Sequence, residues 1–291
     1  MAIDMLHDRI RKLKNPLILD FSMTAEFLPP HLLEQEGSFE KGYIRFCEEL
    51  LEAVSESVAG VRFSFDAFAL LGAEGLQTLS QLLNRAGELG LYRLLDGPQM
   101  LSPWAADRSA QLLLSEEYPC DAMLISPYIG SDAIKPFLTA CTKCGKDLFV
   151  VVRSANKSAS ELQDLLTGTR LVQGAAAELV NRFGEPMFTK CGYSGICSVG
   201  SAGAPDSLRQ LRTQYKRMFL LVDGLDYPSG NVKNCTHAFD KFGYGAALSV
   251  GPTITAAWKQ EEEANSEDYI TSALQEIQRI KKNLARYISI L

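Results

Sequence analysis

The sequence predicts an α/β protein with the (β/α)8 TIM barrel fold, and two observations carry this prediction. Short apolar runs recur eight times along the 291 residues, and helical patterns fill most of the gaps between them. With 46% hydrophobic residues, the chain can also bury one large core. We therefore expect a single domain over residues 1–291, with an N-terminal helix and a long C-terminal helix. A doubly wound open sheet is the competing arrangement.

The eight apolar runs are the predicted strands of the barrel. Each run is followed by turn residues, and active sites of such barrels lie at the C-terminal ends of the strands. The first residues after each run are therefore the candidate site residues. The runs cover residues 17–22, 60–65, 91–96, 121–126, 147–153, 195–200, 218–223 and 245–250.

Apolar spacing and capping residues predict the helices. Ser102 supplies an N-cap and Pro103 suits the first position of a helix, while Ser158 and Glu161 have the spacing of a capping box in a helix that Gly168 would close. Apolar residues three and four apart predict helices over residues 1–15, 40–54, 73–89, 103–114 and from 266 to the C-terminus.

Charge and hydropathy exclude several classes of partner. The net charge of −6 comes without a long block of like charges, which argues against nucleic-acid binding. The N-terminus lacks the pattern of a signal peptide, and no run approaches the 18 apolar residues of a membrane span. We expect a cytoplasmic protein that binds neither membranes nor nucleic acids.

The seven cysteines are odd in number and scattered, which indicates a reducing compartment rather than a disulfide framework. Cys141 and Cys144 match the C-x-x-C pattern but have no second pair or histidine at ligand spacing. We interpret them as helix-packing residues, with redox or zinc chemistry as the alternative.

The predicted strand ends are polar but poor in catalytic residue types, because no histidine and no lysine falls there. Arg62 and Asp96 lie on neighbouring strands and could form an ion pair, either structural or a remnant of ligand recognition. A divalent cation is a further alternative, since oxygen ligands favour magnesium or calcium. The carboxylates that could converge on it are Asp20, Asp66, Asp96, Asp223 and Asp226.

Several peptides in collinear order carry a resemblance to a known family. LILDFSMTAEFLPP, ISPYIGSDAIKPFL and LFVVVRSANKSASELQ resemble the type 2 orotidine 5′-phosphate decarboxylases of bacteria, and the likeness covers almost the whole chain. The resemblance implies a carboxy-lyase of pyrimidine biosynthesis that acts without a metal or other cofactor. It also implies a homodimer and a nucleotide or pyrimidine ligand.

The catalytic motif of that family is degenerate here. Its third strand leads into Asp-x-Lys-Arg-Gly-Asp, and the lysine protonates the carbanion left by carbon dioxide. Asp96 matches the first aspartate, but Pro98 occupies the position of the lysine and Leu101 that of the second aspartate. We expect a pseudoenzyme with weak or no activity, and an active decarboxylase with rewired residues is the alternative. Met100, Leu101 and Trp104 suit a dimer surface or, equally, the core under the following helix.

The resemblance also indicates ligand-binding residues. Arg62 stands where the family has a ribose-contacting lysine, which preserves charge but not shape. Ser126 and Asn156 match positions near the pyrimidine pocket and could hydrogen-bond a ring, although either could instead cap a helix.

The phosphate subsite of the family follows the seventh and eighth strands. Here the backbone N–H groups of Gly224, Gly251 and Thr253 could face an anion. Asp223 and Asp226 lie beside them and would repel it, so phosphate binding at this point is disfavoured.

Overall fold

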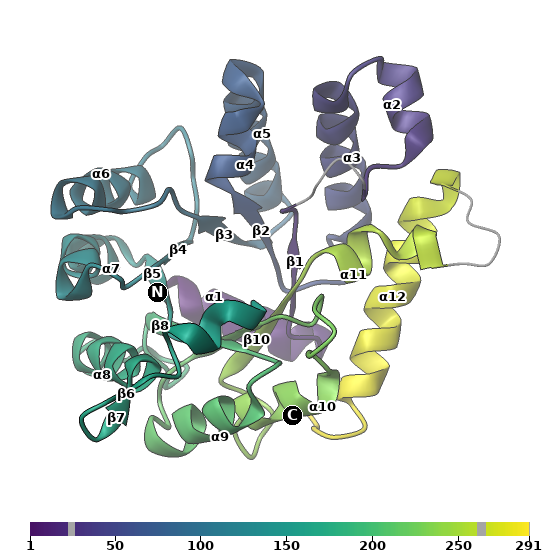
Figure 1. The fold of residues 1–291 in the computed structure, drawn as a ribbon. Helices are drawn as coiled ribbons and strands as arrows, with labels where there is room; N and C mark the ends of the chain where they lie inside the picture. The colour runs from purple at the N-terminus through teal and green to yellow at the C-terminus, as the bar shows by residue number, and fades with distance from the viewer. Residues whose placement is uncertain (23–26, 261–265, 291) are drawn as a thin grey trace.

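The computed structural model describes residues 1–22, 27–260 and 266–290. Eight parallel strands close into a barrel in the order β1-β10-β9-β8-β5-β4-β3-β2, and the helices surround it (Figure 1). The closed barrel confirms the predicted fold over the open sheet.

Each strand lies within a predicted apolar run or extends one residue past it. The strands of the barrel are β1 (Leu17–Asp20), β2 (Gly60–Ser64), β3 (Tyr92–Asp96), β4 (Ala122–Ile125), β5 (Asp147–Val151), β8 (Ile196–Ser201), β9 (Leu220–Asp223) and β10 (Ala246–Val250).

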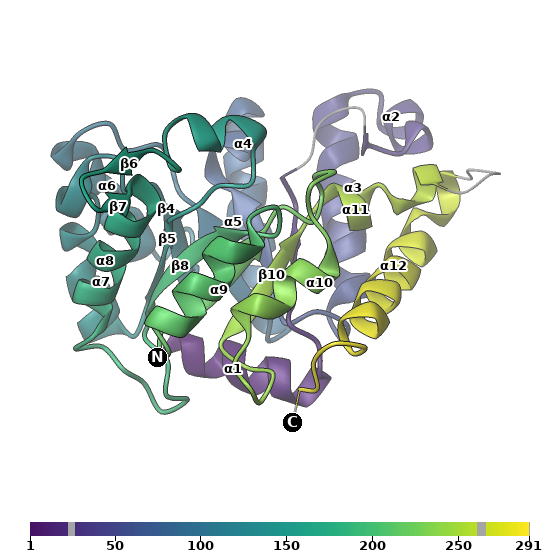
Figure 2. The same cartoon turned by 60° about the horizontal axis from the view of Figure 1, so that its bottom comes forward.

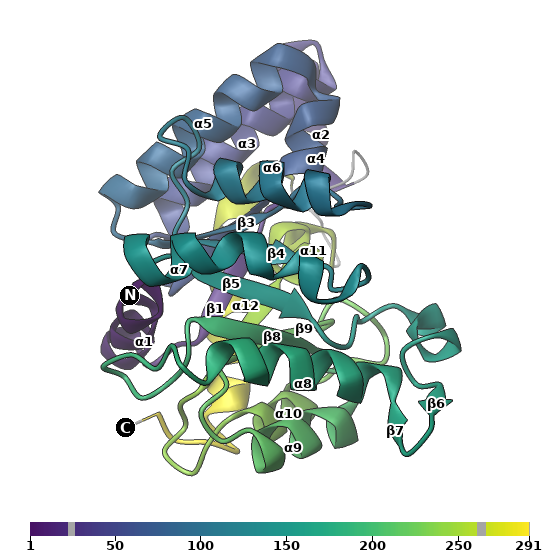
Figure 3. The ribbon, with the colours of Figure 1, turned by 90° about the vertical axis from the view of Figure 1, so that its left-hand side faces the viewer.

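The predicted helices form, including both terminal ones, and further short helices connect the strands. The α-helices are α1 (Ala2–Leu13), α2 (Pro30–Glu36), α3 (Phe39–Val54), α4 (Phe65–Leu70), α5 (Gly72–Glu88), α6 (Pro103–Leu113), α7 (Leu138–Cys144), α8 (Val172–Gly184), α9 (Pro205–Gln214), α10 (Val232–Cys235), α11 (Pro252–Thr255) and α12 (Tyr269–Leu284). The 3-10 helices are η2 (Gly130–Ala133), η3 (Lys135–Phe137), η4 (Lys157–Glu161), η5 (Thr236–Ala238), η6 (Ala257–Gln260) and η7 (Ser266–Asp268). Figure 3 shows α6, α7, α8 and α9 stacked in chain order along one side of the barrel.

The cap predicted for α6 is confirmed, but the one predicted after β5 is wrong. Ser102 Oγ accepts a hydrogen bond from Ala105 N at 3.2 Å. The segment from Ser158 to Glu161 forms only part of η4, without a side-chain cap, and Gly168 lies at the turn between β6 (Leu166–Thr167) and β7 (Arg170–Leu171) with φ 65°. Apart from Ala159, this segment buries no side chain, so it lacks the apolar face that stabilises a longer helix.

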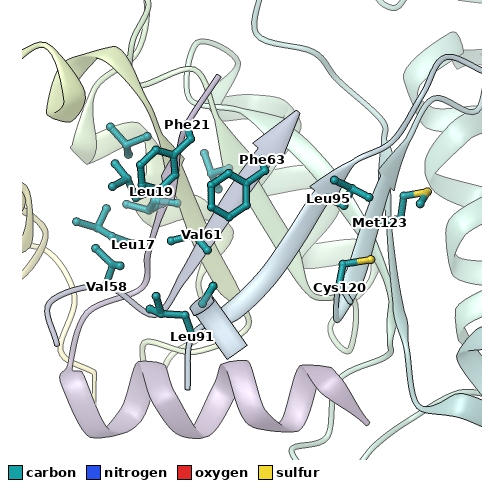
Figure 4. Packing of buried hydrophobic residues seen from close by; sticks show 14 of the residues in the cluster. Leu17, Leu19, Phe21, Val58, Val61, Phe63, Leu91, Leu95, Cys120 and Met123 are labelled. Atoms are coloured by element: carbon teal, nitrogen blue, oxygen red, sulfur yellow. The ribbon is translucent and has the colours of Figure 1, made fainter. Parts of the chain in front are cut away.

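Alternating side chains divide the core into two clusters. Leu17 and Leu19 of β1 point outward to the helices, and Val61 and Phe63 of β2 pack beside them (Figure 4). Ile18, between the two leucines, points into the barrel.

The helix α1 closes the N-terminal end of the barrel. Ile3, Leu6 and Ile10 on its apolar face join the interior cluster, and Ala2 N donates to Gly145 O at 2.8 Å. Figure 2 shows α1 across this end, close to the C-terminus. The opposite end of the barrel, the mouth, is where the strands end.

Candidate functional site at the mouth of the barrel

Four charged side chains from four strands meet at the mouth. The guanidinium of Arg62 lies 2.5 Å from Asp96, 3.1 Å from Asp20 and 3.3 Å from Asp223. Its Nη1 also donates to Ser249 Oγ at 3.2 Å. The predicted ion pair between Arg62 and Asp96 is therefore confirmed, whereas its extension to two further strands was not predicted.

Side-chain alternation explains why these residues meet. On β1, Ile18 points into the barrel and Asp20 follows two residues later; on β3, Leu94 and Asp96 are related in the same way. The same spacing after an inward-pointing leucine places Asp223 of β9 in the mouth. Because the side-chain period of a strand is two, Asp20, Asp96 and Asp223 occupy the last inward positions of their strands. Arg62 lies one inward position before Ser64, the last residue of β2, in register with Asp20.

Arg62, Asp20, Asp96 and Asp223 form a buried cluster, the Arg62 cluster, which carries an excess of negative charge. Arg62 is 8% exposed, and one guanidinium faces three carboxylates, which leaves two negative charges uncompensated. Burial raises the pKa of Asp96 and of Asp223, and the attraction to Arg62 offsets this only in part. Burial alone would lower the pKa of Arg62, but the surrounding carboxylates raise it above its ordinary value. Arg62 therefore holds its proton firmly.

The N–H groups of the expected phosphate subsite are already paired with carboxylates. Gly251 N and Thr253 N donate to the two oxygens of Asp226, at 2.9 and 2.7 Å. Gly224 N, at a backbone φ of 94°, donates to Asp223 at 2.7 Å. An incoming anion would have to displace both side chains, and it would meet their charge.

The candidate residues on the β4 and β5 side form a separate polar group. Asn156 accepts a hydrogen bond from Ser154 Oγ at 2.7 Å, and Gln163 Nε2 donates to the same hydroxyl at 2.8 Å. Ser126 Oγ accepts a long bond of 3.4 Å from Tyr128 N, as in a turn. Ser126 and Gln163 both line a mainly apolar cavity of about 280 Å³ beside the mouth. Gln163 was not predicted as a site residue, although it belongs to the peptide SASELQ, which carries part of the family resemblance.

The alternative of a divalent-cation site is not supported in the described part of the chain. Three of the five candidate carboxylates bind Arg62, Asp226 accepts two backbone N–H groups, and Asp66 is exposed. No group of three or more histidine, cysteine or acidic residues among the described ones is arranged to hold a metal.

The apolar side chains that follow Asp96 are buried in one case and exposed in two. Met100 is buried in the outer cluster, so the core explanation holds for it. Leu101 and Trp104 are 82% and 67% exposed, which fits a surface that another molecule could cover. Among the helices that the structure describes, none combines the length and apolar character needed to cross a bilayer.

Comparisons with known proteins give relatives along most of the chain. No family model matches. The orotidine 5′-phosphate decarboxylase of Rhodopirellula baltica is 29% identical over 252 residues, 82% of this chain and 83% of the relative. That of Caldicellulosiruptor bescii is 26% identical, covering 88% of this chain and 90% of the relative, and that of Clostridium novyi is 23% identical, covering 98% and 99%.

Solved structures share the fold. The structure of Leishmania donovani OMP decarboxylase matches with a TM-score of 0.69 at 23% identity, covering 97% of this chain and 99% of that one. Plasmodium berghei orotidine 5′-monophosphate decarboxylase matches with a TM-score of 0.75 at 14% identity, covering 97% and 98%.

The fold and the ring of inward-pointing polar residues define a TIM barrel protein with its candidate site at the C-terminal ends of the strands. Over most of its length this chain is related to the orotidine 5′-phosphate decarboxylases, as its peptides predicted.

Proposed function

We propose that this chain is an orotidine 5′-phosphate decarboxylase-like protein that has lost most of the catalytic array and is weakly active or inactive. The proposal depends mainly on one observation, which is that Asp96 forms its ion pair with an arginine and not with a lysine. The carboxylate of Asp96 binds Arg62, and among the described residues no lysine forms an ion pair with Asp20, Asp96 or Asp223. Pro98, which follows Asp96 by two residues, has no proton to donate.

Arg62 is a poor substitute for a catalytic lysine. Protonation of a carbanion needs an acid whose pKa lies near the working pH. The carboxylates around Arg62 raise its pKa above an already high value, so the guanidinium can stabilise negative charge but does not release its proton. Asp96 is then a remnant of the array, held in an ion-pair cluster.

Ligand recognition at the mouth is a second part of the proposal. Ser126 and Arg62 could hydrogen-bond a pyrimidine or ribose, with Asn156 supporting the loop. Asp223 and Asp226 oppose a phosphate where Gly224 and Gly251 offer their N–H groups. We therefore expect the mouth to bind a pyrimidine nucleoside at least as well as its monophosphate.

A homodimer in the cytoplasm completes the proposal. Large apolar side chains are exposed in segments that follow four successive strands, β2 to β5. A second copy that faces this mouth would cover them, and dimer interfaces are enriched in such residues. Light scattering should give twice the chain mass of 32.0 kDa, and replacing Leu101 and Trp104 by glutamate should give the monomer. The exposed side chains are Leu70, Leu101, Trp104, Tyr128 and Leu166.

The alternatives are an active decarboxylase with rewired residues and a divalent-cation enzyme on the same barrel. Turnover of orotidine 5′-phosphate by the purified protein separates the first. We expect no turnover above background, and robust turnover that disappears in Asp96→Asn would overturn the proposal. Magnesium or calcium that raises the melting temperature of EDTA-treated protein would favour the second alternative.

A further inference from the structure

A second cleft lies outside the barrel, between α10 and α12. Its volume is about 580 Å³, and the segment after β9 forms one of its walls. Figures 1 and 2 both show α10 beside the lower half of α12, away from the mouth. The polar and aromatic residues that line the cleft are Lys233, Arg279, Arg286, Asn231, Asn283 and Tyr287.

The cleft is positively charged in a protein whose net charge is −6. Arg279 pairs with Glu276 on the same helix at 2.5 Å. The side chains of Lys233 and Arg286 make no ion pair or hydrogen bond within the described residues, so two positive charges remain uncompensated there. This balance is the reverse of that in the Arg62 cluster.

Lys233 and Arg279 lie on helices, and Arg286 lies in the turn that follows α12. Arg279 and Asn283 lie four residues apart on one face of α12, and Arg286 follows in the turn after the helix, where it lines the same cleft. Asn231 faces them from the start of α10, where its Oδ1 accepts a hydrogen bond from Asn234 N at 2.9 Å. Its amide hydrogens therefore remain available to a ligand.

We infer that this cleft binds a small phosphorylated molecule of nucleotide size. Arginine and lysine supply the charge-assisted donors that phosphate prefers, and the volume lies within the usual range of about 300–1,000 Å³ for ligand pockets. Leu225, Val232 and Ile280 give the cleft an apolar wall, and the half-exposed ring of Tyr287 offers a surface for a flat ring. Of the mouth residues described above, only Thr253 also lines the cleft, and the Arg62 cluster is not part of it, so the inference does not rest on the proposed function.

Calorimetric titration of the full chain with inorganic pyrophosphate, UMP and uridine tests the inference. We expect pyrophosphate and UMP to bind in this cleft and uridine not to do so, with affinity that falls as salt is added. The variant Lys233→Glu/Arg286→Glu should lose affinity for pyrophosphate by at least about tenfold, because it reverses two of the charges that face the ligand.

The variant Lys282→Glu is the matched control. Lys282 is exposed on the same helix and lies outside the cleft lining, so its charge reversal should change the affinity less than about twofold. Lys233→Gln/Arg286→Gln provides a milder second variant, with circular dichroism as the check on folding. The inference is overturned if the native chain binds no pyrophosphate at about 10 mM, a concentration at which even very weak sites fill. Equal losses in the cleft and control variants would also overturn it, and so would UMP binding that depends on Ser126 instead of the cleft.

Discussion

The two ends of the barrel bury carboxylates in opposite ways. At the mouth, Asp96 and Asp223 share the guanidinium of Arg62. At the closed end, under α1, Asp147 is fully buried, and its Oδ2 accepts a hydrogen bond from Tyr92 at 2.8 Å. Its Oδ1 has no hydrogen-bond partner in the described part of the chain.

The two ends therefore differ in how a buried carboxylate is stabilised. A buried charge must be paired or neutralised, because low-dielectric surroundings penalise an isolated ion. At the mouth the guanidinium of Arg62 is the counter-ion, and it compensates one of the three carboxylate charges. Among the described residues no such cation contacts Asp147, and burial raises the pKa of this carboxyl well above its ordinary value. Burial therefore favours the neutral form of Asp147.

The largest effect should come from removing the counter-ion at the mouth. Arg62→Leu leaves three carboxylates facing one another in a buried ring, and we expect a loss of about 3–5 kcal/mol in the free energy of unfolding at pH 7. The loss should shrink at pH 5, where the carboxyls of Asp96 and Asp223, whose pKa values are raised, take up protons more readily. Urea denaturation at both pH values measures it.

Arg85→Leu is the control for this variant. Arg85 forms ion pairs with Glu52 and Glu88 on the exposed surface, where water screens the charges, so its removal should change stability little. Equal losses in Arg62→Leu and Arg85→Leu would contradict the buried-cluster account.

The buried carboxyl of Asp147 at the closed end should make the folding stability depend on pH. Since the pKa of Asp147 is raised in the folded state, the unfolded chain binds fewer protons once pH exceeds the ordinary aspartate value. Folding stability is then lost as pH rises towards the folded pKa, by up to about 1.4 kcal/mol per pH unit. Asp147→Asn should remove this slope, so the variant gains on the native chain between pH 4 and pH 8.

Unfolding free energies at pH 4, 6 and 8 check this prediction. Parallel profiles for the native chain and Asp147→Asn would show that the carboxyl is ionised in both states. Tyr92→Phe is a useful companion variant, because it removes the hydrogen bond to Asp147 and keeps the ring.

A smaller effect is expected for the carboxylate that occupies the backbone donors after β10. Asp226→Ala leaves the N–H groups of Gly251 and Thr253 without their acceptor, at a cost of about 1–3 kcal/mol. Asp226→Asn keeps one oxygen acceptor and should lose less. Thermal unfolding of both variants measures the difference, and an unchanged melting temperature in Asp226→Ala would show that water replaces the carboxylate at no cost.

The smallest effect should come from a neutral cap beside the mouth. Ser102→Ala removes the hydrogen bond from Ala105 N at the start of α6, which should cost about 1 kcal/mol. The value provides a baseline for a polar contact that involves no buried charge. A loss as large as that of Arg62→Leu would show that the segment after Asp96 contributes far more than a helix cap.

The fold could be predicted from the sequence, because strand and helix periodicity is a local property of the chain. Eight apolar runs of strand length gave the eight strands, and the alternation within them decided that Asp20 and Asp96 face inward. The Ser158 capping box failed because capping spacing alone does not supply an apolar face to bury.

The contacts of the inward-facing side chains could not be predicted, because they depend on how distant segments pack. Closure of the sheet brings β9 across from β2, so Arg62 reaches Asp223, 161 positions away in the chain. Pairing of the neighbouring strands β9 and β10 brings Asp226 to the N–H groups of Gly251 and Thr253, and Asp147 is buried at the closed end. The burial and the ion pairs of these side chains depend on segments that are distant in the chain. A local sequence pattern therefore cannot predict them.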